Sequence, residues 1–195
     1  MLRDLLATLP KPDDNAELLV GNDTGDDAAV YRIDETRAIV ATTDFFMPVV
    51  DDPFDFGRIS ATNALSDVYA VGGRPILALA ICGMPIDKVT SEVIRDVLAG
   101  GAAVCKNAGV PVAGGHSIDT LEPIYGLAVI GMVDIANIKR NIGARPDDVL
   151  ILGKGLGTGF MSNAVKSGTI SDSGYAELIA STTRLNDIGY DLGAR

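Results

Sequence analysis

The sequence predicts an α/β or α+β fold in which strands and helices form layers. Strand-like and helix-like segments alternate over residues 28–134, and this alternation is typical of folds that pack helices on a sheet. The 195 residues are 47% hydrophobic but only 5% aromatic. The core is therefore expected to consist mainly of Ala, Val, Ile and Leu.

The N-terminal part begins with a helix-like segment and continues into two strands. Residues 2–10 have the pattern of a short amphipathic helix, and residues 11–27 have the composition of a loop. Residues 28–33 and 37–44 are apolar and rich in β-branched side chains, which predicts two strands. The segment DET at 34–36 is expected to form the tight connection between them.

The middle of the chain is expected to form helix, strand and helix. Small and apolar residues recur with helical spacing over 56–71, and Gly72 and Gly73 end that pattern. The run PILALAICGMP at 75–85 indicates a buried strand. Residues 90–109 have the pattern of a second helix, which begins near Thr90 or Ser91 and ends at a glycine.

Two further strands are expected at 110–118 and 123–134, after which the character of the chain changes. A strand entering a glycine-rich turn is expected within residues 145–160, and a helix over 173–195. The apolar residues on one side of that helix, with nothing further in the chain to cover them, are Leu178, Ile179, Leu185, Ile188 and Leu192. We therefore expect a domain boundary near residue 148, with a mobile or sticky tail after it.

Composition limits the classes of partner. The formal net charge is -10, which argues against a general nucleic-acid or membrane-surface binder, since both need a basic face. Nucleotide binding through divalent cations stays compatible with this charge. Two isolated cysteines give no zinc motif and suit a reducing compartment. The sequence contains no signal-like leader or long apolar run, so a cytoplasmic location is expected.

Acidic side chains stand out against this apolar background at three places. Asp26 and Asp27 are adjacent, and Asp44 ends an expected strand; capping of turns would also explain Asp26 and Asp44. Asn63 and Asp67 are four residues apart and share one helix face. No basic residue lies one turn from Asp67, although a carboxylate on a largely buried helix needs a partner. Mg²⁺, which takes carboxylate and phosphate oxygens together, would supply that partner.

Two glycine-rich segments are candidates for phosphate contacts. In AGGHS, residues 113–117, backbone N–H groups could approach a phosphate closely, with His116 and Ser117 as added donors. A β-bulge with a satisfied histidine is the alternative explanation. GKGLGTGF, residues 153–160, fits neither common phosphate-loop pattern, and a simple strand-to-helix turn is the alternative there.

These motifs together resemble the selenophosphate synthetase (selenide, water dikinase) family. GNDTGDDAAVY, TTDFFMPVVDDPFDFGRISATNALSDVYAVGGRP, AGGHSID and PIYGLAVIG carry the resemblance, which extends from about Leu18 to Gly159 and weakly to the end. The wider superfamily is aminoimidazole ribonucleotide synthetase-like. The resemblance implies an N-terminal domain of that fold, which forms a β-barrel across a homodimer, plus the start of an α/β C-terminal domain.

The resemblance also implies an activity and its site. The activity is the ATP-dependent synthesis of selenophosphate from selenide and water, with release of AMP and phosphate and with Mg²⁺ as cofactor. The implied metal ligands are Asp27, Asp44 and Asp67. The implied nucleotide-binding residues are Thr24, Gly25, Asp26, Asp44, Asn63 and Asp67, with Gly115, His116 and Ser117 contacting ATP across the dimer interface. The alternatives are another ATP-dependent enzyme of the superfamily and a non-catalytic nucleotide-binding dimerisation module.

The sequence departs from the family pattern at both ends. The glycine-rich segment with the family's nucleophilic cysteine and lysine is absent before Met1, so no catalytic residue is assigned. Cys82 and Cys105 are expected to be buried, inert thiols. We therefore expect a folded fragment that is inactive alone. Residues 1–148 would form the ATP-binding and dimerisation domain, and 149–195 the incomplete start of the C-terminal domain.

Overall fold

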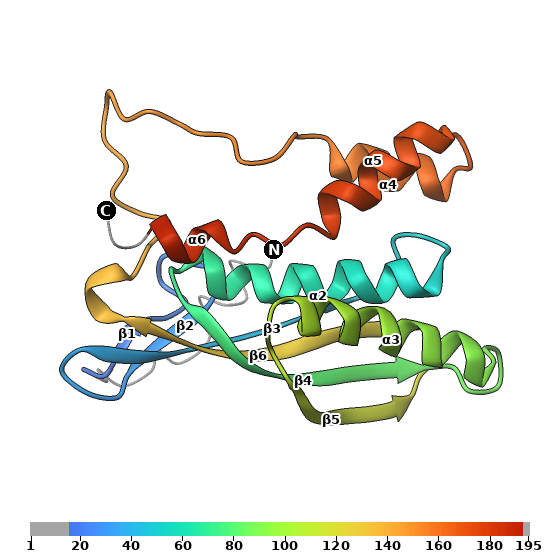
Figure 1. Cartoon of the computed structure of the whole chain (residues 1–195), viewed down its shortest axis with the longest axis horizontal. Coiled ribbons are helices and arrows are strands. Elements are labelled where there is room, and N and C mark those ends of the chain that lie inside the picture. The colour runs from blue at the N-terminus through green and yellow to red at the C-terminus, as the bar shows by residue number, and fades with distance from the viewer. Residues whose placement is uncertain (1–15, 193–195) are drawn as a thin grey trace.

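The computed structural model describes residues 16–192 as a six-stranded sheet with helices on one face (Figure 1). The strands are β1 (Leu18–Val20), β2 (Ala29–Arg32), β3 (Arg37–Phe46), β4 (Arg74–Met84), β5 (Val112–Asp119) and β6 (Ile124–Asp134). The helices are α2 (Pro53–Ala70), α3 (Ser91–Asn107), α4 (Thr158–Lys166), α5 (Asp172–Thr182) and α6 (Ile188–Asp191), with a 3-10 turn η1 (Ile135–Asn137). This architecture confirms the predicted fold class. The helix expected at 2–10 lies outside the described residues.

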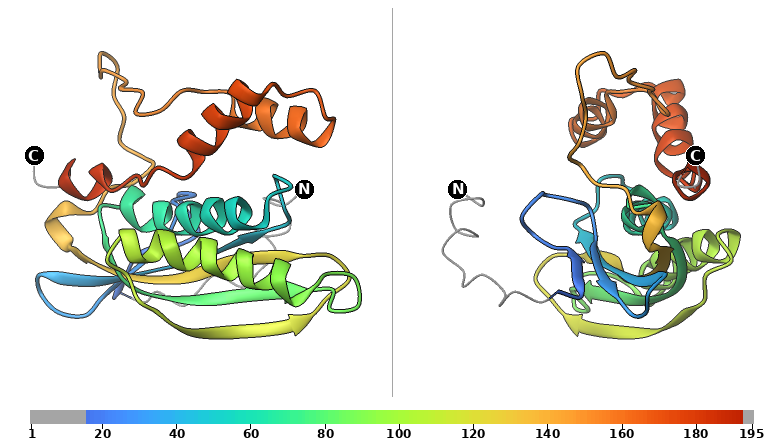
Figure 2. Two further views of the ribbon diagram at one scale, coloured as in Figure 1. Left: turned by 45° about the vertical axis from the view of Figure 1, so that its right-hand side comes forward. Right: turned by 90° about the vertical axis from the view of Figure 1, so that its left-hand side faces the viewer.

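The strand order is β1-β2-β3-β6-β4-β5, and the only parallel pair in this sheet of the described residues is β4 with β5. Parallel neighbours need a long crossover connection, and α3 provides it between these two strands. α2 and α3 lie side by side over one face of the sheet, with the C-terminal segment above α2 (Figure 2). Between residues 16 and 192, no helix covers the opposite face.

The expected strands and helices over residues 28–134 are all present, with ends shifted by up to three residues. The prediction of an uninterrupted loop over 11–27 was wrong, because β1 lies within it and pairs antiparallel with β2. A three-residue strand is too short to show an alternating pattern of its own. α2 begins earlier than expected, since Asp52 caps it and Pro53 occupies its first turn.

α2 and α3 approach each other closely at a pair of glycines. A Cβ atom placed on Gly57 would lie 2.0 Å from the carbonyl oxygen of Val97, and one on Gly100 would lie 2.0 Å from that of Phe54. Only residues without a side chain fit at such separations. This crossing fixes the position of α2 over the sheet.

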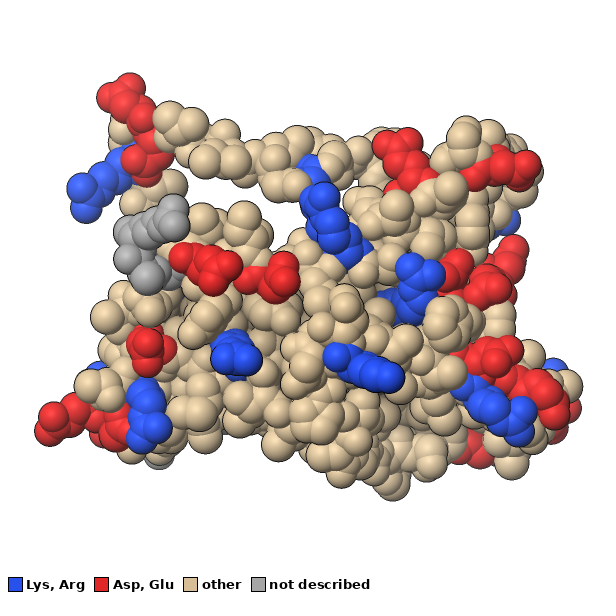
Figure 3. Space-filling model, viewed as in Figure 1, with Lys and Arg blue, Asp and Glu red and all other residues tan. Residues whose placement is uncertain are grey.

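The segment between η1 and α4 differs from the expected strand near residue 150. Val149, Leu150 and Ile151 are 84%, 94% and 90% exposed and form no strand. An opening separates this segment from the body of the molecule (Figure 3). No neighbouring strand lies alongside it among residues 16–192, so its backbone lacks the ladder that would make it a strand.

The continuous helix expected over 173–195 was also wrong, since α5 ends at Thr182 and α6 covers only 188–191. Leu178 and Ile179 are buried rather than uncovered, whereas Ile188 and Leu192 are exposed. α2 lies against this segment, and the pairs Arg58–Thr183 and Ser66–Asn186 join the two by side-chain hydrogen bonds of 2.7 and 2.8 Å. The tail is therefore docked through polar as well as apolar contacts.

Both cysteines are buried, as predicted. Burial raises the pKa of the Cys105 thiol to about 11 and also raises the pKa of Cys82, so neither forms a reactive thiolate readily at neutral pH. Within residues 16–192, no helix has the length and apolar character needed to cross a membrane.

Candidate functional site

The candidate site lies where α2 faces β3. Thr42 and Asp44 are two residues apart on β3 and therefore point to the same side of the sheet. Two strand residues span about 6.6 Å, and the four residues from Asn63 to Asp67 rise about 6 Å along α2. The spacings match, so Asn63 Nδ2 donates to Asp44 Oδ2 while Thr42 Oγ1 donates to Asp67 Oδ2 at 2.7 Å.

Asp67 is a half-buried carboxylate in an unfavourable electrostatic position. Burial raises its pKa to about 6, and the charges of Asp44 and Asp27 add to this effect, while the hydrogen bond from Thr42 opposes it. Asp67 also lies in the last turn of α2, which contains no basic residue and where the helix dipole disfavours negative charge. The group is held in a place that favours a bound cation.

Asp44 shares this environment. Burial raises its pKa, and the hydrogen bonds from the Asn63 side chain and the Phe45 backbone N–H oppose that rise. Within the described chain, none of Asp27, Asp44 and Asp67 forms an ion pair with a lysine, arginine or histidine. The negative charge of the site is therefore uncompensated by the described residues themselves.

The loop before β2 brings the paired aspartates to this site. The hydroxyl of Thr42 contacts the carbonyl oxygen of Asp27 at 3.4 Å, which joins the loop to the strand that carries Asp44. Asp27 is exposed, whereas Asp26 is half-buried and accepts a hydrogen bond from the hydroxyl of Thr24. The predicted residues Thr24, Gly25, Asp26 and Asp27 are thus contiguous with the α2–β3 site.

The three carboxylates of the site fit Mg²⁺ that is also bound by substrate phosphates. Among residues 16–192, no three His, Cys, Asp or Glu side chains form a ready-made metal cluster. Asp27 and Asp44 instead lie close enough to Asp67 for their charges to raise its pKa. Mg²⁺ usually keeps several waters and binds through one or two carboxylates together with substrate phosphates. These carboxylates suit that mode of binding better than an all-protein cage.

The second predicted group of residues lies elsewhere. Gly115, His116 and Ser117 are exposed on the edge strand β5, three strand spacings from β3 and therefore about 14 Å away. β5 carries an extra residue relative to β4 between the pairs Ala78–Val112 and Ala80–Gly115, and a register shift of this kind is compatible with the β-bulge alternative. Within one subunit, the chain does not bring these residues to the acidic site.

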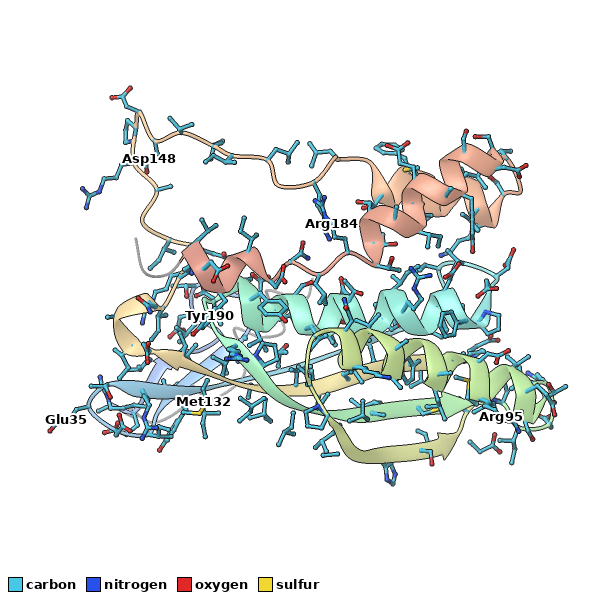
Figure 4. All side chains as sticks on the ribbon, in the orientation of Figure 1. Glu35, Arg95, Met132, Asp148, Arg184 and Tyr190 are labelled. Carbon is cyan, nitrogen blue, oxygen red and sulfur yellow. The ribbon has the colours of Figure 1, made fainter. Side chains whose placement is uncertain are left out.

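The glycine-rich segment before α4 has a structural explanation. Lys154 Nζ donates to the carbonyl oxygens of Ser181 and Arg184 at 2.9 and 2.5 Å. Arg184, labelled in Figure 4, donates back to the carbonyl oxygen of Gly153 at 2.9 Å. The ammonium group thus closes the end of α5. A turn leads into α4 here, but the strand that the strand-to-helix alternative requires is absent from the described residues.

Two residues with roles in the site were not identified from the sequence. Thr42 donates its hydroxyl hydrogen to Asp67 and lies in contact with the carbonyl oxygen of Asp27, and its position two residues before Asp44 was the available signal. Asn141 Nδ2 donates to the carbonyl oxygen of Gly25 at 2.9 Å, and its backbone N–H donates to Asp26 Oδ1 at 2.5 Å. A contact across more than a hundred residues has no local signal.

The sequence and the fold agree with a known class of protein. Residues 25–133, more than half of the chain, match the family described as AIR synthase related protein, N-terminal domain. The chain belongs to this family. Within it, a protein of Burkholderia pseudomallei (strain K96243) named selenide, water dikinase is 61% identical over 194 residues. That alignment covers 100% of this chain and 55% of the relative, so the chain spans about half the length of the curated relatives it matches.

Solved structures support the same fold at lower sequence identity. A crystal structure of a protein from Thermus thermophilus aligns with a TM-score of 0.77 at 23% identity, covering 98% of this chain and 63% of that one. A structure described as AaThiL complexed with AMPPCP and TMP aligns with a TM-score of 0.68 at 19% identity, covering 87% and 56%.

Proposed function

We propose that this chain forms the nucleotide-binding part of a selenide, water dikinase. This phosphotransferase makes selenophosphate from selenide, ATP and water, and releases AMP and phosphate. The observation that carries the proposal is the identity of about 60%, over the whole chain, with relatives that bear this name. In this proposal residues 1–148 bind ATP and form a dimer, and residues 149–195 begin a second domain.

The acidic site supports the nucleotide part of the proposal. Asp27, Asp44 and Asp67 would hold Mg²⁺, which supplies positive charge against ATP phosphates when it is bound. Thr24, Gly25, Asp26 and Asn63 lie beside these carboxylates and would line the nucleotide site. The fold neighbour in complex with AMPPCP is consistent with a nucleotide site in this architecture.

The chain's own residues would position the phosphates and limit the charge repulsion. Thr42 holds one oxygen of Asp67 and Asn63 holds one of Asp44, so each carboxylate keeps a defined orientation before any ligand arrives. Preorganised groups of this kind lose little free energy to rearrangement during reaction.

The proposal includes a homodimer. The sheet face opposite α2 and α3 exposes Phe45, Leu79 and Ile118 at 46%, 38% and 49%, and Met132 also lies on it (Figure 4). An apolar sheet face of this kind is typical of an interface. A second copy covering it would bring Gly115, His116 and Ser117 of one subunit within reach of the site of the other. In sedimentation, the chain should give a species of about twice 20.3 kDa, and a monomer at micromolar concentration would contradict this part.

A chimera tests the activity directly. These 195 residues would replace the matching part of the Burkholderia pseudomallei relative, and AMP release would be followed with and without selenide. Selenide-dependent AMP formation within about tenfold of the parent enzyme is expected. ADP formation without dependence on selenide would instead favour another ATP-dependent enzyme of the superfamily. Binding of MgATP without turnover, in a chimera that is folded and dimeric, would favour a nucleotide-binding module.

A further inference from the structure

The adjacent aspartates of the loop before β2 have different surroundings. Both carboxylate oxygens of Asp26 are occupied, Oδ1 by the backbone N–H of Asn141 and Oδ2 by the hydroxyl of Thr24. The side chain of Asp27 is exposed and has no hydrogen bond or ion pair within residues 16–192. The carboxylate of Asp26 is thus committed to the protein, whereas that of Asp27 is available to a ligand.

Asn141 makes a second contact with the same turn. Its side-chain Nδ2 donates to the carbonyl oxygen of Gly25 at 2.9 Å, and Gly25 has a φ of 66°. This left-handed backbone conformation is accessible to glycine at little cost. Residues 22–25 form a turn outside the sheet, so contacts from distant residues are needed to select one conformation for it.

Asn141 is itself held in place by its neighbours. Lys139 Nζ donates to the carbonyl oxygen of Gly189 in α6 at 2.7 Å, and the backbone N–H of Lys139 donates to the carbonyl oxygen of Val71 at 3.1 Å. Arg140 donates to the carbonyl oxygen of Leu19 in β1. Three consecutive residues therefore join the end of α2, β1, α6 and the turn.

We propose that Asp26 and Asn141 are positioning residues that hold the turn so that Asp27 faces Asp44 and Asp67, and that Asp26 is not a metal ligand. Hydrogen bonds to a charged carboxylate are about twice as strong as hydrogen bonds between neutral groups. The negative charge of the Asp26 carboxylate therefore strengthens its hydrogen bonds with Asn141 and Thr24. A misplacement of about 1 Å at a site for charged groups costs up to about a hundredfold in rate. The inference rests on the proposed function, because it assigns Asp27 to a nucleotide-bound metal.

The first arm of the test needs no ligand. Amide hydrogen exchange of the 195-residue chain would be measured by NMR for wild type, Asp26→Ala and Asn141→Ala. The amide of Asn141 should exchange at least about tenfold faster in Asp26→Ala, because its acceptor is gone. Residues 22–27 should exchange faster in both variants, while β3 and β6 stay protected. Asn163→Ala, at an exposed position of α4, is the control.

The second arm measures MgATP binding by calorimetry. Asp26→Ala and Asn141→Ala should each weaken MgATP binding about tenfold. Because both residues hold the same turn, the double variant should lose less affinity than the two single losses multiplied together. Asp26→Asn can keep both hydrogen bonds with the polarity of one reversed, and it should lose clearly less affinity than Asp27→Asn.

The outcomes separate the two proposals. Unchanged exchange at Asn141 and in the turn would overturn the positioning role, and so would faster exchange with wild-type affinity for MgATP. An affinity loss in Asp26→Asn as large as that in Asp27→Asn would make Asp26 a ligand and overturn the inference as well. Absence of MgATP binding by the folded wild-type dimer would count against the proposed function, while the exchange data would still decide whether the turn is held by these residues.

Discussion

The two ends of helix α2 hold carboxylates in opposite circumstances. At the N-terminal end, Asp55 pairs with Arg58 at 2.8 Å, accepts from the hydroxyl of Tyr175 at 3.4 Å and lies in the first turn, where the helix dipole favours negative charge. At the C-terminal end, Asp67 has the dipole against it and no cation paired with it among the described residues. One carboxylate stabilises the helix, and the other is placed against the electrostatic preference of the helix.

This difference supports our proposal that the C-terminal end of α2 serves binding. Folding alone would favour a neutral residue in place of Asp67, since its charge is half-buried beside Asp27 and Asp44. Retention of such a charge is typical of functional sites, where burial and like charges perturb a pKa. Matched substitutions of the two aspartates can therefore strengthen or contradict the comparison.

The largest effect is expected on catalysis. In the chimera with the Burkholderia relative, Asp67→Asn should lower selenide-dependent AMP formation by about a hundredfold or more, because a charge that holds the metal is lost. Asp55→Asn, the same substitution on the same helix, should change the rate by less than about threefold. A rate within about threefold of the parent for Asp67→Asn would contradict its role as a metal ligand.

The second effect is on stability: Asp67→Asn should increase the free energy of unfolding, whereas loss of a favourable interaction would decrease it. The pKa of Asp67 is raised from 3.8 to about 6 in the folded state, so the stability that its protonated form provides is complete below about pH 4 and is lost as the pH rises through 6. Without metal at pH 7, Asp67→Asn should therefore be more stable than wild type by about 1–2 kcal/mol, allowing for partial exposure.

Chemical unfolding between about pH 3.5 and 7.5 measures this difference. It should shrink toward zero at the acidic end, and addition of MgATP should stabilise the wild type but not the variant. A variant that is less stable than wild type at pH 7 would show that the carboxylate of Asp67 contributes to folding, as Asp55 does.

A smaller effect should come from the hydroxyl that orients Asp67. Thr42→Val keeps the shape of the side chain but removes the hydrogen bond of 2.7 Å, which should raise the pKa of Asp67 further and weaken MgATP binding about five- to tenfold at pH 7. Thr42→Ser keeps the hydroxyl and should stay within about twofold of wild type. Equal losses for Val and Ser would indicate a packing effect instead.

The smallest effect belongs to the other end of the helix. Asp55→Asn removes the partner of Arg58 and a charge near the helix N-terminus, which should cost about 0.5–1 kcal/mol of unfolding free energy. The cost should not depend on Mg²⁺. If Mg²⁺ changed the stability cost of Asp55→Asn, the N-terminal end of α2 would also be coupled to metal binding, which would contradict the comparison.

The sequence predicted the α2–β3 site because its signals are local. A spacing of four on a helix places Asn63 and Asp67 on one face, and the absence of a nearby basic residue marks Asp67 as unpaired. The contacts of Asn141 with Gly25 and Asp26 depend on how distant segments pack, so no periodicity or composition reports them.

The prediction of strands succeeded where neighbours exist and failed where they do not. β4 and β6 have the same apolar character as residues 149–152, but they pair with each other along their length. An apolar, β-branched sequence can form a strand, but it does so only where a neighbouring strand pairs with it. The helix prediction over 173–195 failed for a similar reason, because docking against α2 follows contacts at Ser66 and Thr183 rather than helical periodicity.

The crossing of α2 and α3 at Gly57 and Gly100 affects which positions of the chain tolerate amino-acid substitutions. The carbonyl oxygen of each facing segment lies 2.0 Å from where a side chain would begin, so even alanine at either position must push the two helices apart. α2 would then shift relative to β3, and the spacing that aligns Asn63 and Asp67 with Asp44 and Thr42 would be lost. In a screen of random variants scored only by turnover, Gly100 on the non-catalytic helix α3 would be as intolerant as a metal ligand.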